Sequence, residues 1–167
     1  MNNDQRPVVN QRLYFCRLHL QWLSEQLQQQ ILPQGLLNQC LGESVLLHLV
    51  MAYRAYLVEI AAAYSIDTAP ITDVQALIAK LEANGKESAE AKELLQLTLP
   101  GQWLSDLLEK YQAIGPVSVA INKPGLGQFI AVREIDSSPS INWDCLQSWL
   151  EQLNQVIANQ RARLEEW

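Results

Sequence analysis

The sequence predicts a mainly α-helical protein, with an antiparallel bundle of three long helices, two or three short helices, and a small β-hairpin before the last helix. Two observations carry this prediction. Near the start of the chain, apolar residues recur at alternating steps of three and four, which is the period of one buried helix face. Residues 45–64 are apolar almost all round, as expected of a helix at the centre of a soluble bundle.

The first long helix is predicted over residues 5–31. Proline is tolerated in the first turn of a helix, which accommodates Pro7, and Pro33 ends the helix before it. The predicted buried seam of this helix comprises Val9, Leu13, Cys16, Leu20, Leu23, Leu27 and Ile31.

The second long helix is predicted over residues 35–65. At about 100° per residue, Ser44, His48 and Glu59 project within one narrow arc, and Arg54 lies off that arc. The segment is long enough to cross a membrane. The charge of Arg54 near its middle disfavours insertion, so we expect a buried helix and no membrane association.

Three short helices are predicted in the middle of the chain. Thr72 and Gln75 have the spacing of a capping box, Gly85 fits the position after a helix end, and Pro100 breaks the pattern. The predicted short helices cover residues 73–84, 88–98 and 101–113.

The segment before the last helix is predicted to form a β-hairpin. Residues 117–121 and 128–132 are rich in β-branched and aromatic residues, and the segment between them is rich in turn residues. We therefore expect a hairpin insertion over residues 117–132. Asn142 then fits the cap of a last helix that continues to the end of the sequence.

Composition narrows the class of protein. The chain has 167 residues, of which 49% are hydrophobic and 18% charged, with a formal net charge of −6. These values predict one domain spanning residues 1–167, and the acidic balance disfavours nucleic acid as a partner. Three widely spaced cysteines form no disulfide framework, and the polar start lacks a signal-peptide core. We therefore expect a cytoplasmic location.

Four stretches, in their order and spacing, carry a resemblance to a known family. They are Asn10 to Phe15 (NQRLYF), the run from Leu47-His48-Leu49 to Glu59-Ile60-Ala61, Gln102-Trp103-Leu104, and the tail from Leu146-Gln147-Ser148-Trp149 to Glu166-Trp167. With these stretches, the chain resembles an uncharacterised family of small, mostly helical gammaproteobacterial proteins classed as a domain of unknown function. The resemblance implies a single-domain, cytoplasmic, mainly helical protein, and it implies no activity.

Metal and cofactor chemistry is not favoured by the sequence. The carboxylates of the helices are not followed three residues later by histidine, as they are in di-metal bundles. The two histidines of the chain, His19 and His48, fall on different predicted helices. Gly125 and Gly127 lie between two predicted strands, which is the wrong context for a dinucleotide-binding loop. We expect neither a metal nor a cofactor.

One enzymatic alternative is a ribonuclease of the type found in HEPN-like helical bundles. Active members of that class carry an arginine, then four to six intervening residues, then a histidine, and six residues lie between Arg12 and His19 here. Histidine would act as general acid or base, and arginine would hold the phosphate. The pair lies in the middle of the first helix rather than at the start of a late one, which disfavours this alternative.

A second alternative is a small anionic-ligand site on the second helix. Arg54 in an apolar helix needs a partner, because an unpaired buried charge is very costly. A structural interpretation pairs Arg54 with Glu25 or Glu151 of a neighbouring helix. A functional interpretation places it in a pocket with His48 and Glu59, lined also by Tyr53 and Tyr56.

The preferred hypothesis is a non-catalytic interaction or adaptor protein, acting on an unidentified protein partner or on itself as a homodimer. The chain has five tryptophans, among them Trp143, Trp149 and Trp167, and exposed aromatic patches commonly mark contacts. The predicted hairpin also offers an edge for strand addition.

Overall fold

The computed structural model describes residues 5–114 and 141–165, and this part of the chain is mainly helical, as predicted. The described residues contain three long helices, α1 (Arg6–Gln29), α2 (Gln34–Ala63) and α6 (Trp143–Glu165). They also contain three short ones, α3 (Val74–Ala83), α4 (Ala89–Leu97) and α5 (Trp103–Ile114). No strand occurs in these residues, and the hairpin predicted over 117–132 lies outside them.

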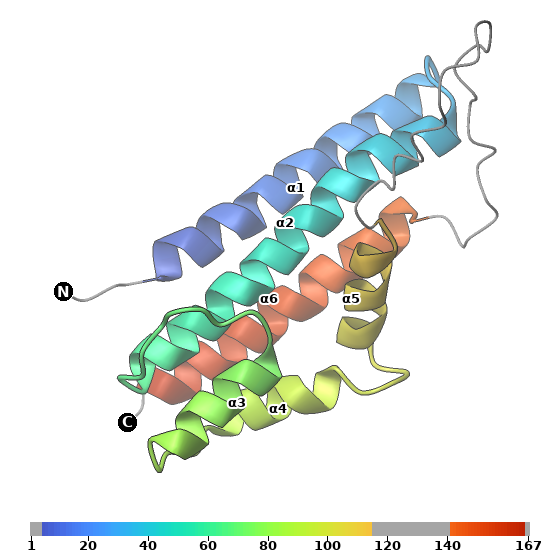
Figure 1. Ribbon diagram of the computed structural model, residues 1–167. Helices are drawn as coiled ribbons and strands as arrows, with labels where there is room; N and C mark the ends of the chain where they lie inside the picture. The colour runs from blue at the N-terminus through green and yellow to red at the C-terminus, as the bar shows by residue number, and fades with distance from the viewer. Residues whose placement is uncertain (1–4, 115–140, 166–167) are drawn as a thin grey trace, which may run out of the picture.

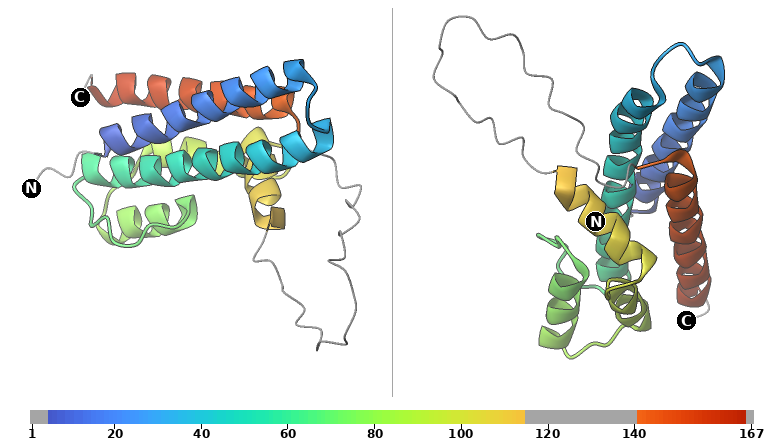
Figure 2. Two further views of the ribbon diagram at one scale, coloured as in Figure 1. Left: turned by 90° about the horizontal axis from the view of Figure 1, so that it is seen from above. Right: turned by 90° about the vertical axis from the view of Figure 1, so that its right-hand side faces the viewer.

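Helix α2 lies at the centre of the arrangement. It contacts each of the other five described helices, and α1 and α6 also contact one another. Figure 1 shows α1 and α2 side by side in opposite directions, and Figure 2 shows the short helices gathered on another side of α2. The prediction that this helix lies at the core of the protein is therefore confirmed.

The direction of α6 refines the predicted antiparallel arrangement. The start of α6 lies near the start of α2, since a Cβ atom at Gly42 would come within 3.6 Å of Leu146. Their ends also meet, where Tyr56 hydrogen-bonds Gln160. Helix α6 is thus parallel to α2 and antiparallel to α1, because the short helices carry the chain back along α2 (Figure 1).

Helix α1 forms from the predicted seam, but it is shorter than predicted. Val9, Leu13, Cys16, Leu20 and Leu23 are buried along one side. Gln30 adopts a left-handed backbone conformation with φ of 53° and ends the helix. The prediction that Ile31 continues the seam is wrong, because the chain has already turned and its side chain is 75% exposed.

Helix α2 has the apolar surface that the sequence predicts. Its fully buried side chains come from several sides of the helix, and Tyr53 and Tyr56 are the largest. By length and composition alone, α2 is apolar enough to cross a membrane, a property that core helices of soluble proteins share. In the structure, 61% of its most apolar window is buried inside the protein.

Two of the short helices, α3 and α4, begin at side-chain caps. Asp73 accepts a hydrogen bond from the backbone N–H of Ala76 at 2.8 Å, and Ser88 caps α4 in the same way. The predicted capping role of Thr72 is therefore wrong by one residue, and its hydroxyl donates to Asp73 instead. Asn142 caps α6 as predicted, accepting from the N–H of Cys145 at 2.9 Å.

Candidate functional site

The predicted site residue Arg54 is not buried. Its side chain is exposed, and its guanidinium carbon lies 5.6 Å from the ring centroid of Tyr111 on α5. The predicted partners are engaged elsewhere, since Glu25 accepts from Gln21 and Glu151 accepts from Gln147. Arg54 therefore makes a cation–π contact at the surface, and the prediction of a buried ion pair at this position is wrong.

The buried charge of α2 is Glu59, and Arg161 of α6 is its partner. Both oxygens of Glu59 accept hydrogen bonds from Arg161, each at 2.7 Å. The exposed fractions of the two side chains are 8% and 18%. Arg6 of α1 adds a second cation 3.6 Å away. A planar two-point contact of this kind is the strongest form of ion pair, and it joins the three long helices.

The sequence analysis missed Arg161 because it lies in the polar last turns of α6. Its Nη1 donates to Asn10 at 2.9 Å, and its guanidinium lies 6.0 Å from the ring centroid of Tyr56. The sequence feature that indicates such a partner is Glu59, because a carboxylate in an apolar helix requires a cation from a neighbouring helix. That signal does not say which helix supplies it.

His48 packs against α1. Its ring stacks on that of His19 with a centroid distance of 5.1 Å, and Phe15 meets it edge-on at 5.3 Å. The Nδ1 atoms of both histidines are buried and have no hydrogen-bond partner among the described residues. Burial, together with the electrostatic effects of nearby His19 and Arg12, lowers the pKa of His48 below its ordinary value.

The three predicted ligand residues therefore face three different helices. His48 faces α1, Arg54 faces α5 and Glu59 faces α6. The shared arc that the sequence predicts for His48 and Glu59 is an angular relation only, because eleven residues separate them by about 16 Å along the axis. Tyr53 and Tyr56 are buried core residues. The structure does not bring this set together.

The Arg12 and His19 pair lies on one helix, α1. Seven positions separate the two residues, which is about 10 Å along the helix axis. His19 is stacked on His48, and Arg12 is close enough to lower the pKa of His48. Both residues thus belong to the contact between α1 and α2.

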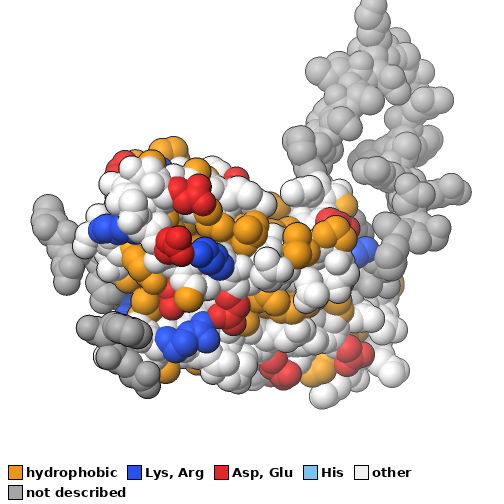
Figure 3. Space-filling view, turned by 90° about the horizontal axis from the view of Figure 1, so that it is seen from below, with side chains coloured by type: hydrophobic (Ala, Val, Ile, Leu, Met, Phe, Trp, Pro, Cys, Tyr) orange, Lys and Arg blue, Asp and Glu red, His pale blue; other side chains and the backbone are white. Residues whose placement is uncertain are grey.

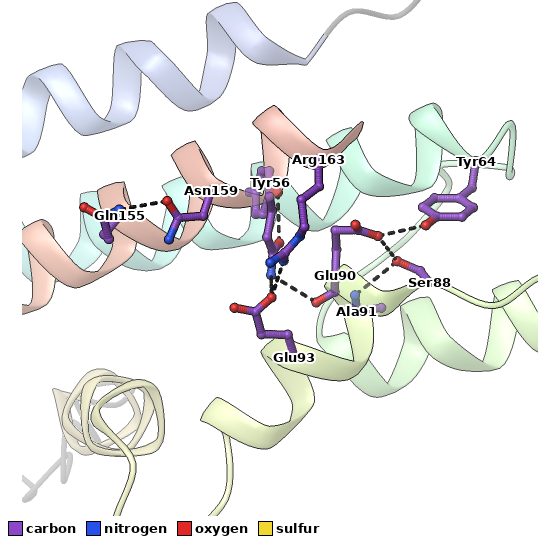
Figure 4. A network of polar contacts seen from close by, with 10 residues as sticks. Tyr56, Tyr64, Ser88, Glu90, Ala91, Glu93, Gln155, Asn159 and Arg163 are labelled. Atoms are coloured by element: carbon purple, nitrogen blue, oxygen red, sulfur yellow. Dashed lines mark hydrogen bonds and ion pairs between the residues drawn. The ribbon is translucent and has the colours of Figure 1, made fainter. Parts of the chain in front are cut away.

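A network of polar contacts surrounds the end of α6 (Figure 4). The hydroxyl of Tyr56 donates to Gln160 at 2.9 Å, and the amide of Gln160 donates to Glu93 at 3.1 Å. Glu93 also binds Arg163. The network ties α2 and α6 to α4, and it satisfies the fully buried side chain of Gln160.

The second carboxylate in this network is Glu90. Its Oε2 accepts from Tyr64 and from Ser88, each at 2.8 Å. Burial opposes ionisation of this carboxyl, but hydrogen bonds from its own backbone N–H and from Tyr64 and Ser88 outweigh it, and the pKa of Glu90 falls below its ordinary value. Both acids of α4 discussed here are therefore committed to structural contacts.

The outward side of α1 carries a row of apolar residues. Tyr14, Leu18 and Trp22 follow one another at steps of four, with exposed fractions of 54%, 43% and 51%. At about 100° per residue, the row lies on the side of α1 opposite to its buried seam. A further group of exposed apolar side chains near the α1–α2 turn comprises Ile31, Leu32 and Leu36.

The predicted tryptophan patch on the last helix does not form. Trp143 is half-buried and donates from its indole N–H to the carbonyl of Leu20 at 3.2 Å. Trp149 is 6% exposed. Both rings pack inward because the start of α6 rests on the other long helices, and Trp167 lies outside the described residues. Among the tryptophans that the structure describes, the exposed one is Trp22.

The underside of the molecule carries a second apolar region. Figure 3 shows hydrophobic side chains in a band with acidic and basic side chains beside it. Leu99, between α4 and α5, is exposed, while Leu95, Leu97 and Trp103 are half-buried. Because most of these side chains are partly covered, the row on α1 is the more exposed apolar feature.

Two hollows lie between helices. The larger one, about 700 Å³, lies between α2 and α5 and is lined by residues that include Cys40, Leu47 and Tyr111. The smaller one, about 150 Å³, lies between α1 and α6. Among the described residues, no three His, Cys, Asp or Glu side chains are grouped as metal ligands would be.

The chain matches one known protein family. The profile of DUF6586, a family of unknown function, matches residues 1–167. The chain belongs to the DUF6586 family. The resemblance drawn from the four sequence stretches to an uncharacterised domain is thereby confirmed. No curated protein and no solved structure matches this DUF6586 chain.

The Glu59–Arg161 pair predicts a large stability effect in this DUF6586 protein. Replacing Glu59 with Gln leaves Arg161 without a counter-charge at a largely buried position. We expect the free energy of unfolding to fall by about 3 kcal/mol, measured by urea denaturation. Glu87→Gln is the matched control, because Glu87 pairs with Lys92 at an exposed position, and it should change stability little. Equal effects of the two substitutions would contradict a stabilising role for Glu59.

The stacked histidines predict a pH dependence. Because the pKa of His48 is lowered in the folded state, the unfolded chain binds more protons below about pH 6.5. The free energy of unfolding should therefore fall as pH drops from 7.5 to 5.5, and this slope should flatten in His48→Gln. Urea denaturation across that pH range measures it. An unchanged slope in the variant would exclude His48 as the responsible group.

Proposed function

We propose that this chain is a non-catalytic, cytoplasmic interaction protein that associates with a second copy of itself through the outward side of α1. The observation that carries the proposal is the exposed row of Tyr14, Leu18 and Trp22. Contiguous apolar side chains on a protein surface commonly mark an interaction site, and aromatic residues are enriched at such sites.

The row is self-complementary. If two α1 helices pack antiparallel about a two-fold axis at Leu18, Leu18 meets the partner's Leu18. Tyr14 then meets the partner's Trp22, four positions away on each side. A two-fold interface requires each patch to fit a copy of itself, and an arrangement of large, small and large side chains meets that requirement.

The contacts of the other polar residues favour an interaction protein over an enzyme. Glu59 is bound by Arg161, Arg54 lies on Tyr111, and His48 stacks on His19. Each residue that the sequence suggested for ligand binding thus makes a contact that holds two helices together. The apolar row on α1 makes no comparable contribution to the fold, because it points away from the core.

The oligomeric state tests this proposal. We expect wild-type protein at tens of micromolar to sediment as a dimer. We expect Leu18→Glu to sediment as a monomer with an unchanged circular dichroism spectrum, because the substitution places two carboxylates face to face at the two-fold axis. Gln34→Glu adds the same charge at an exposed position in the first turn of α2, outside the row, and should stay dimeric.

Two results would overturn the proposal. One is a wild-type protein that remains monomeric at tens of micromolar. The other is a Leu18→Glu variant that dimerises as strongly as the wild type, because the interface would then lie elsewhere.

A further inference from the structure

The smaller hollow lies between α1 and α6 and has a distinctive lining. Asn10 and Arg17 approach from α1, and Asn154 and Arg161 approach from α6. The apolar side chains of the lining come from Leu13, Ile157 and Ala158. The described residues that line the hollow thus include two arginines, and none of them is an acid.

The side-chain oxygens that line the hollow already accept hydrogen bonds. The amide oxygen of Asn10 accepts from Arg161, and that of Asn154 accepts from Arg17, each at 2.9 Å. The amide nitrogen of Asn154 donates to the carbonyl of Leu150. A guanidinium carries five N–H donors, and Arg17 uses one of them in this pairing. The side chains with unused N–H donors in the hollow include Arg17 and Asn10.

The charge of the hollow is positive. Glu59 neutralises Arg161 through two hydrogen bonds and lies outside the lining. Within residues 5–114 and 141–165, no carboxylate is paired with Arg17, which bonds to the amide of Asn154. Arg17, whose side chain is exposed, therefore supplies the uncompensated positive charge of the hollow. This is a local exception in a chain whose net charge is −6.

We propose that this hollow is a binding site for a small oxyanion, a carboxylate or phosphate group. Arg17 and Asn10 would donate hydrogen bonds to the anion, Arg17 would supply the positive charge, and Arg161, held in place by Glu59, would position Asn10. The volume of about 150 Å³ equals about five water molecules at liquid density, which suits a phosphate or a short dicarboxylate. The site lies on the flank of α1 that faces α6, so it does not depend on the proposed dimer.

Titration with two named anions tests the site. The Nε–Hε resonances of the arginines are recorded by NMR while inorganic phosphate or succinate is added at constant ionic strength. We expect the resonances of Arg17 and Arg161 to shift to saturation. The probe that saturates at lower concentration distinguishes a phosphate ligand from a carboxylate ligand.

Two variants with the same charge change complete the test. Arg17→Gln removes an exposed side chain and leaves the Glu59–Arg161 pair intact, so we expect the fold to be retained and the affinity to fall about tenfold or more. Arg54→Gln lies on α2 outside the hollow and should bind as the wild type does. Shifts that never saturate and that include Arg54 would overturn the proposal, as would equal affinities of Arg17→Gln and the wild type.

Discussion

The structure depends on one constraint: α2 is apolar on almost every side, so most of its surface must be covered. A helix with this composition cannot rest at a surface as an amphipathic helix does. Each of the five other described helices contacts it. Helices α1 and α6 cover two sides of α2, and the short helices cover much of the rest as they carry the chain back to the start of α6, while Leu47 and Arg54 stay exposed.

The position of α6 is set by the few polar groups that α2 contains. Glu59 sits in a largely buried position and draws Arg161, with Arg6 nearby. One turn earlier, Tyr56 donates to Gln160. A buried carboxylate tolerates few alternative partners, because an unpaired one is costly. These contacts therefore fix how far α6 extends along α2, which packing of apolar side chains alone would specify less sharply.

The helices themselves were predictable because their signals are local. The seam of α1, the apolar run of α2 and the caps at Ser88 and Asn142 can be read from neighbouring residues, and the structure places each helix within about two residues of its predicted bounds. The site was less predictable, since it depends on which helix lies opposite each side chain. The sequence suggested burial for Arg54, yet α5 leaves that residue at the surface. It gave no indication that Arg161 is the partner of Glu59.

The different sides of α1 make different contacts. The seam side holds α1 to α2, the flank beside α6 carries the arginine-lined hollow, and the outward row of apolar residues is the surface that we propose for self-association. All of this requires α2 to be the most stable element. Native-state hydrogen exchange tests that requirement most directly. Amides of residues 45–60 should exchange only through global unfolding, while those of α3 and α5 exchange through smaller openings. Exchange of the α2 amides as fast as those of α5 would contradict the account.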